Sequence, residues 1–259
     1  MSPYDGSLKN AAQRSRSFGA VADAYERIRP GYPAALFDDL LAYAGPVGRV
    51  LEAGAGTGRA TAELVARGLP VHAVEHDASM ASVLLSRLPS VEVTVGGFET
   101  GPTDGPYDLL VSAQAWHWID PHVRWVRAAS CLRSGGALAL FWNLDLPTND
   151  ALRELLQEAH DRWTPGMRVD DREPVVDLLA EWPGPDLAGL PEFTDLEARR
   201  YAWERQLSGA DYVELLSTMS AYSVRPAAAR EGLFAELREI VGDEIVLRME
   251  TVLYLARRV

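Results

Sequence analysis

Short apolar runs alternate with amphipathic segments in the middle of the chain. The apolar runs are bounded by glycine, proline or polar residues and predict buried strands at 49–54, 71–76, 91–96, 107–114 and 137–143. Apolar residues at helical spacing predict helices at 59–68, 77–88 and 120–136. Strands that alternate with helices at this pitch favour a parallel, doubly wound α/β sheet with helices on both of its faces.

The regular alternation of strands and helices does not continue outside this alternating region. Before it, helical spacing occurs at 18–25 and from Pro33 onward, on either side of a turn that contains prolines. After it, the spacing predicts helices within 149–163, 210–223 and 227–242, and strands at 194–207 and 244–259. Because no linker to a second independent domain is visible, we interpret 144–192 as an insertion.

The composition limits which binding partners and which cellular compartment are expected for this chain. The 259-residue chain has a formal net charge of −12, and so acidic a surface repels nucleic acid. No run approaches the roughly 20 apolar residues of a membrane span, and the first residues lack the apolar run of a secretory signal. The single cysteine, Cys131, lies in an apolar context typical of a buried residue and suits a reducing cytoplasm. Ligand spacing typical of metal sites is absent, so no metal is expected.

The most informative segment is the glycine-rich turn at 52–58, E-A-G-A-G-T-G, which directly follows a predicted strand. Glycines let a ligand lie against main-chain N–H groups. Dinucleotide-binding proteins place their third glycine three residues after the second, whereas Gly58 follows Gly56 by two. Glu52 would repel a phosphate and tolerate a cationic ligand. Glu75, which ends the next strand, can accept hydrogen bonds from both hydroxyls of a ribose.

These residues resemble a known family. The pattern E-x-G-x-G-x-G, followed by an acid that ends the second strand, is similar to the class I S-adenosylmethionine-dependent methyltransferases. Segments 18–33, 112–120, 132–136 and 251–258 resemble the subgroup of trans-aconitate methyltransferase-like proteins. The resemblance implies a Rossmann-like three-layer sheet of seven strands, with the last strand antiparallel beside the fifth. It implies N-terminal lid helices at 1–45, a cofactor-binding core at 46–143, a helical insertion that covers the site at 144–192, and C-terminal strands and helices that complete the sheet at 193–259.

The resemblance also implies contacts to the cofactor S-adenosylmethionine. The glycine turn would run under its methionine and ribose parts, Glu75 would bind the ribose diol, and His76 and Met80 would pack near the adenine. The family usually has Asp after the third strand, where this chain has Gly97-Phe98-Glu99, so the Phe98 N–H with Glu99 would substitute. The full predicted cofactor set is Tyr25, Arg29, Glu52, Gly54, Ala55, Gly56, Glu75, His76, Met80, Gly97, Phe98, Glu99, Ala113, Gln114 and Trp116.

The turn after the fourth strand supplies the candidate catalytic residue. His117 is the only side chain of this turn that titrates near neutral pH, which makes it a candidate general base. The alternative is a histidine that only orients the loop. Residues predicted to line an acceptor pocket are Tyr32, Trp142, Asn143, Thr218 and Tyr222.

The resemblance and the composition together predict a cytoplasmic methyltransferase, a monomer or homodimer, that binds neither nucleic acid nor membrane. Its acceptor would be a small molecule that offers a carboxylate, hydroxyl, amine or carbon nucleophile. Two alternatives stay open. One is a catalytically silent S-adenosylmethionine-binding protein, and the other is an NAD(P)-dependent oxidoreductase, against which the glycine spacing argues.

Overall fold

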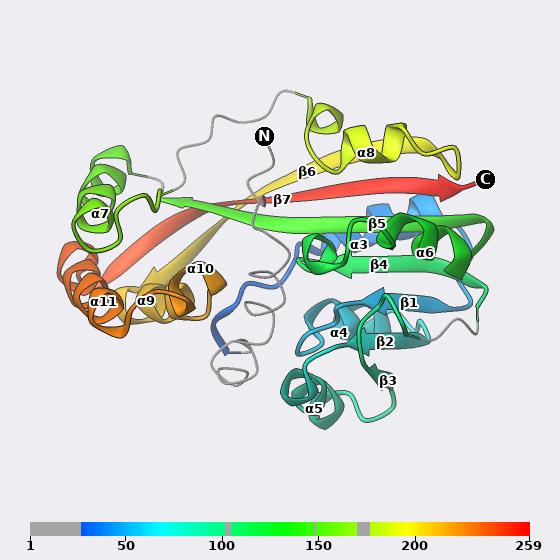
Figure 1. Ribbon diagram of the computed structural model, residues 1–259, viewed down its shortest axis with the longest axis horizontal. Coiled ribbons are helices and arrows are strands. Elements are labelled where there is room, and N and C mark those ends of the chain that lie inside the picture. The colour runs from blue at the N-terminus through cyan, green and yellow to red at the C-terminus, as the bar shows by residue number, and fades with distance from the viewer. Residues whose placement is uncertain (1–26, 102–104, 148, 170–176) are drawn as a thin grey trace.

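A seven-stranded mixed sheet organises the chain (Figure 1). The computed structural model describes residues 27–101, 105–147, 149–169 and 177–259. In spatial order the strands are β3 Glu92–Val95, β2 Val71–Glu75, β1 Val50–Ala53, β4 Tyr107–Ala113, β5 Leu132–Pro147, β7 Glu244–Arg258 and β6 Phe193–Ser208. Strands β1 to β5 pair in parallel, whereas β7 pairs antiparallel with both β5 and β6. The predicted fold class is confirmed.

Helices cover both faces of the parallel part of the sheet. Helices α3 (Ala34–Ala44) and α4 (Arg59–Ala66) bury Leu36, Leu40 and Leu64 against one face. The other face carries η2 (Trp116–Trp118), α6 (Arg124–Cys131), η3 (Leu178–Ala180) and α8 (Gly184–Ala188). Helix α5 (Ala78–Arg87) packs over β2 and β3. In these described ranges, no helix is both long enough and apolar enough to cross a membrane.

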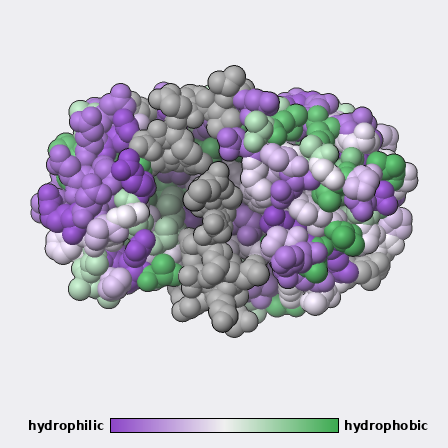
Figure 2. All heavy atoms as spheres, turned by 45° about the horizontal axis from the view of Figure 1, so that its top comes forward, coloured by the Kyte–Doolittle hydropathy of each residue, from purple (hydrophilic) through white to green (hydrophobic). Residues whose placement is uncertain are grey.

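A second hydrophobic core lies at the far end of the long strands. There α7 (Asp150–Trp163), α9 (Gly209–Ser217), α10 (Ser220–Ser223) and α11 (Ala227–Val241) gather around the ends of β6 and β7 (Figure 1). We call these four helices the distal lobe. Its surface is mostly hydrophilic in Figure 2, at the left. Apolar side chains that it buries include Leu156, Ala159, Val213, Leu216, Leu233, Leu237, Ile245, Leu247 and Met249.

Strand β5 is longer than the predicted run at 137–143. It begins at Leu132, directly after α6, and continues to Pro147. Residues 144–147 form a strand because they pair with β7, as in the pairs Leu144 with Glu250 and Asp145 with Met249, whereas Leu132 pairs with Tyr107 of β4. The helix predicted for 120–136 therefore ends at Cys131. The boundary expected between 143 and 144 falls inside this strand.

The two regions predicted to cover the site, 1–45 and 144–192, contain helices that pack in different parts of the structure. Within 144–192, α7 packs on α11 in the distal lobe, whereas η3 and α8 pack on the face of the sheet that carries α6. Within 1–45, α3 belongs to the main core. Residues 1–26 of the expected N-terminal lid lie outside the described ranges.

The distal core gives a test of stability on one helix. Leu156 is fully buried, so we expect Leu156→Ala to lower the free energy of unfolding by roughly 2–5 kcal/mol. The neighbouring Leu155 is 49% exposed, and Leu155→Ala should change it by no more than about 0.5 kcal/mol. Urea denaturation followed by circular dichroism measures both. Equally small effects would contradict the placement of α7 in a folded core.

Candidate cofactor and active site

The glycine turn after β1 makes a close contact with the turn after β4. Gly54 has a φ of 73° and Gly56 a φ of 57°, which is left-handed backbone that L side chains rarely adopt. A Cβ added at Gly54 would lie 2.4 Å from the Cβ of Ala115. Only glycine fits at that position, and the carboxyl ends of β1 and β4 meet there. Ligands of open α/β sheets bind at this edge of the sheet.

Glu75 ties the glycine turn to the end of β2. Its Oε2 accepts from the backbone N–H of Gly56 and its Oε1 from that of Asp77, each at 2.8 Å. His76 Nδ1 lies 3.1 Å from Oε1. Because each carboxylate oxygen has two lone pairs, Glu75 can accept further hydrogen bonds from a ligand. Structure and sequence therefore agree on where this acid lies.

Glu52 is the second acid of the site, and it is buried in the core of the turn. Its Oε2 accepts from Thr61 Oγ1 at 2.6 Å, whereas its Oε1 has no hydrogen-bond partner among the described residues. Burial raises the pKa of Glu52 from its ordinary value of 4.5 to about 8, since desolvation disfavours the charged form. The turn thus holds a carboxyl group with one oxygen available to a donor. Thr61 has no signal in the sequence, because only the α4 geometry brings it to Glu52.

The segment after β3 reaches the same edge of the sheet. Phe98 is buried and lies against Trp116, with ring centroids 5.7 Å apart. Glu99 Oε1 accepts from the backbone N–H of Asp120 at 3.1 Å, and its other oxygen lies close over Gly97. Met80, from α5, is buried, and its Sδ would lie 3.8 Å from a Cβ at Gly56. Met80 therefore lies at the glycine turn, whereas Phe98 and Glu99 contact the segment that follows β4.

The turn after β4 is held mainly by backbone contacts. Ala113 ends the strand, and Gln114 has a left-handed φ of 59° with its N–H bonded to Phe141 O at 2.9 Å. Trp116 has no exposed surface and packs against Phe98 and Trp125. Trp116 therefore packs in the core, and the cofactor contact that the sequence predicts for it stays a prediction.

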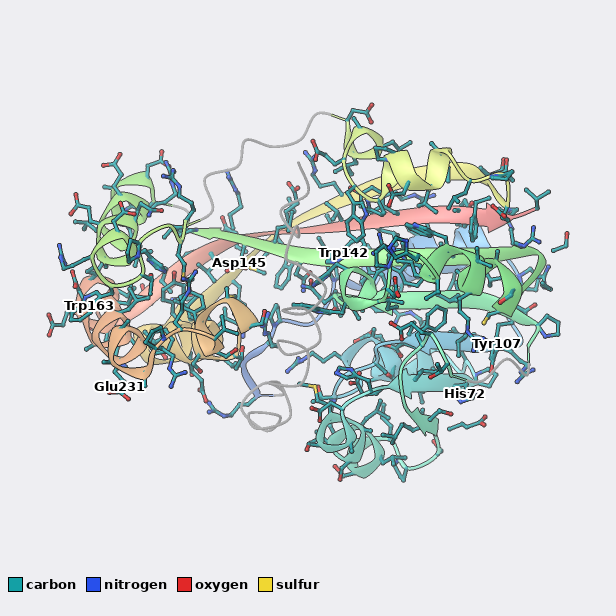
Figure 3. All side chains as sticks on the ribbon, in the orientation of Figure 1. His72, Tyr107, Trp142, Asp145, Trp163 and Glu231 are labelled. Carbon is teal, nitrogen blue, oxygen red and sulfur yellow. The ribbon has the colours of Figure 1, made fainter. Side chains whose placement is uncertain are left out.

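His117 follows in the same turn, beside the indole of Trp142. The Nε1–H of Trp142 donates to Nδ1 of His117 across 3.2 Å. Trp142 is 3% exposed and comes from the middle of β5, as Figure 3 shows. Its ring packs edge-on against Trp182 at 5.3 Å and Tyr254 at 6.0 Å. Sequence reasoning missed Trp182, which lies in the proline- and glycine-rich segment that carries α8.

Several residues predicted to bind cofactor or acceptor join segments of the chain in the structure. Arg29 donates from Nε to Thr218 Oγ1 at 3.0 Å and from a terminal nitrogen to Thr218 O at 3.1 Å. Tyr32 packs against Phe141, with ring centroids 4.8 Å apart. Asn143 donates to Gly31 O at 2.9 Å and accepts from Thr251 Oγ1 at 2.6 Å. Tyr25 lies outside the described residues.

Tyr222 bonds to a buried histidine of the distal lobe. His160 Nδ1 lies 2.6 Å from the carbonyl of Leu156, which can only accept, so this nitrogen carries the proton. His160 Nε2 therefore accepts from the hydroxyl of Tyr222 at 2.9 Å. Burial lowers the pKa of His160 below 6.5 and so favours its neutral form.

Comparisons with known proteins agree with this fold. Residues 50–136 match the family model of a methyltransferase domain. An uncharacterized methyltransferase of Mycobacterium tuberculosis is 36% identical over 235 residues, covering 90% of this chain and 88% of the relative. An uncharacterized methyltransferase of Schizosaccharomyces pombe is 26% identical over 259 residues, covering 94% of this chain and 98% of the relative.

Solved structures share the fold of this chain. A candidate type II methyltransferase from Anaeromyxobacter dehalogenans is similar with a TM-score of 0.64 at 26% identity, covering 88% of this chain and 97% of that one. Phosphoethanolamine N-methyltransferase 2 of Haemonchus contortus, in complex with phosphomonomethylethanolamine and S-adenosylhomocysteine, shares the fold with a TM-score of 0.54 at 18% identity, covering 99% of this chain and 61% of that one. Fold and site thus define a Rossmann-like protein of the methyltransferase class. The chain belongs to this methyltransferase family.

The raised pKa of Glu52 predicts a pH dependence of stability. Between about pH 4.5 and pH 8 the folded chain holds more protons at Glu52 than the unfolded chain does. This contribution to the free energy of unfolding is fully present at low pH and falls as the pH rises through that window, by up to about 1.4 kcal/mol per pH unit. Glu52→Gln cannot ionise, so its stability relative to wild type should increase across the window.

Urea denaturation at several pH values measures this effect. Glu231→Gln, at an exposed position of the distal lobe, is the matched control and should follow the wild-type profile. A constant difference between Glu52→Gln and wild type over the whole window would contradict the assignment.

Proposed function

We propose that this chain is an S-adenosylmethionine-dependent methyltransferase that acts on a small-molecule acceptor. The observation that carries the proposal is the glycine turn flanked by two buried acids, Glu52 and Glu75. The proposal extends to the trans-aconitate methyltransferase-like subgroup, supported by segments 18–33 and 112–120, and to a cytoplasmic location, supported by the single buried cysteine.

The charge of the turn suits a cationic ligand. Glu52 Oε1 lacks a hydrogen-bond partner among the described residues, and an ammonium group supplies the donors that such an oxygen requires. A phosphate at the same turn would be repelled by the carboxylate of Glu75 and would supply no donor to Glu52 Oε1. A cofactor with an amino-acid part therefore fits these residues better than a dinucleotide does.

The shape of the turn suits the same cofactor. At Gly56, the atom nearest to an added Cβ is Met80 Sδ at 3.8 Å, so the turn leaves room beside its main chain. Glu75, whose oxygens are oriented by two backbone N–H groups, would hold the ribose diol. Glu52 and the backbone at 54–56 would hold the methionine part, with Met80 and Phe98 beside the adenine.

When bound, S-adenosylmethionine supplies an electrophilic methyl group. The residues of this chain would then align an acceptor with that methyl group and exclude water, which is the main contribution a protein makes to such a displacement. The turn that carries His117 packs on the glycine turn, so the acceptor would approach beside it. Acceptors with carboxylate, hydroxyl, amine or carbon nucleophiles are all compatible with this role.

Ligand binding and product release test the proposal. Calorimetry with the full chain should detect binding of S-adenosylmethionine and S-adenosylhomocysteine and none of NADH. A screen of small-molecule acceptors should then release S-adenosylhomocysteine only when the correct acceptor is present. Binding of NADH alone would favour the oxidoreductase, whereas cofactor binding without release by any acceptor would favour a catalytically silent protein.

A matched pair of glycine substitutions tests the turn itself. Gly56 and Gly68 both have left-handed backbone, and an added Cβ meets no close atom at either position. Gly56→Ala and Gly68→Ala should therefore cost similar stability, roughly 1–2 kcal/mol. Only Gly56→Ala should also weaken S-adenosylhomocysteine binding, by about tenfold or more, because its Cβ occupies the ligand side of the turn. Equal affinities of the two variants in calorimetry would remove Gly56 from the binding site.

A further inference from the structure

The hydrogen bond from Trp142 determines which nitrogen of His117 carries the proton. An indole N–H can only donate, so His117 Nδ1 accepts and the neutral imidazole carries its proton on Nε2. We propose that Trp142 is a positioning residue that holds His117 as an Nε2–H donor toward the methyl acceptor. His117 then orients the acceptor and does not remove its proton. This inference rests on the proposed function.

Trp142 is well held for such a role. It lies on β5 opposite Val252 of β7, and its ring packs between those of Trp182 and Tyr254. Trp182 is fixed in turn, since its indole N–H donates to Asp186 Oδ2 at 3.1 Å. Asp186 also pairs with the buried Arg124 of α6 at 3.5 Å. The α8 segment, the last strand and α6 therefore all restrain the indole that faces His117.

His117 belongs to the turn after β4, which contacts the glycine turn of the proposed cofactor site. Ala115, two residues earlier in the same turn, is the residue that contacts Gly54 of the glycine turn. The rings of His117 and Trp118 lie 4.6 Å apart, and His117 is only partly buried. His117 thus belongs to the turn that contacts the proposed cofactor turn, and its imidazole is held by Trp142.

The protonation pattern decides what His117 can do. A general base would have to take the proton on Nδ1, because Nε2 already carries one. Protonation there would set two N–H donors against each other and leave the buried Trp142 Nε1 without its acceptor. An Nε2–H donor binds a lone pair of the acceptor and makes that atom less nucleophilic. The acceptor class is therefore one with a hydrogen-bonding oxygen or nitrogen beside the atom that attacks the methyl group.

Nuclear magnetic resonance of histidine-labelled full chain tests the proton position without any acceptor. Long-range proton–nitrogen spectra at about pH 8, where histidines are mostly neutral, distinguish protonated from unprotonated ring nitrogens. Five histidines give signals, and His117→Gln identifies those of His117. We expect Nε2 protonated and Nδ1 unprotonated in wild type. The opposite pattern would overturn the proposal, and this measurement needs no substitution at Trp142.

Trp142→Phe keeps an aromatic ring but removes the donor. The fraction of the Nδ1–H form should rise roughly threefold or more in this variant. The control is Trp163→Phe, which also loses one indole N–H, bonded to Glu236 Oε2 at 2.7 Å, but lies in the distal lobe, far from Trp142 (Figure 3). It should leave the signals of His117 unchanged. A wild-type pattern in Trp142→Phe, or an equal change in both variants, would overturn the role of Trp142.

The donor role is tested with an acceptor found by the screen above. His117→Gln can place an amide N–H near the position of Nε2 and should keep turnover within about tenfold of wild type. A lost general base would instead cost about 10²–10⁴ in both His117→Gln and His117→Asn, and that result would overturn the proposal. Calorimetry tests the proposed function separately from the proton position in His117. If wild type failed to bind S-adenosylmethionine, the proposed function would be rejected, whereas the proton position is decided by the magnetic resonance spectra alone.

Discussion

The antiparallel pairing of β7 between β5 and β6 is the interaction on which the rest of the structure depends. The ladder with β5 runs from Ala137–Arg257 to Pro147–Leu247, and the ladder with β6 extends further, to Ser208–Glu244. Strands of this length span about 50 Å at the usual rise per residue. They therefore pass from the main core, where Leu253 and Leu255 are buried, into the distal core, where Leu247 and Met249 are buried. Neither core could keep its position relative to the other without this ribbon.

Two acids at the ends of neighbouring strands give the glycine turn its chemical character. Glu75 accepts from one backbone N–H on each oxygen, which orients the carboxylate and leaves lone pairs for a ligand. Glu52 has a hydroxyl donor on one oxygen and none among the described residues on the other, and burial opposes its ionisation. A cationic ligand would relieve that cost by supplying both charge and donors. In the proposed function, the difference between these acids would favour a cationic ligand by electrostatics in addition to shape.

The sequence predicted the fold and the location of the turn because both depend on local signals. Alternating strands and helices indicated the doubly wound sheet, and the glycines with Glu75 marked the carboxyl edge of β1 and β2. The length of β5 was not predictable, because residues after Asn143 become a strand only through pairing with β7. Likewise, Trp116, Tyr32 and Asn143 carry polar or aromatic side chains suited to ligands. Their packing and hydrogen-bond partners come from distant segments that no local pattern reveals.

The two sides of the proposed site depend on different parts of the chain. On the cofactor side, the glycine turn, its two acids, Met80 and Phe98 all lie within 50–120, in the alternating region. The acceptor side centres on Trp142, whose ring receives Trp182 from the α8 segment and Tyr254 from the last strand. His117 accepts the hydrogen bond of that indole. The α8 segment and the last strand, which lie outside the alternating region, therefore help to orient His117, which lies inside it. Substitutions in the α8 segment can therefore alter how an acceptor is held without changing the glycine turn or its two acids. The same cofactor turn can thus serve different acceptors.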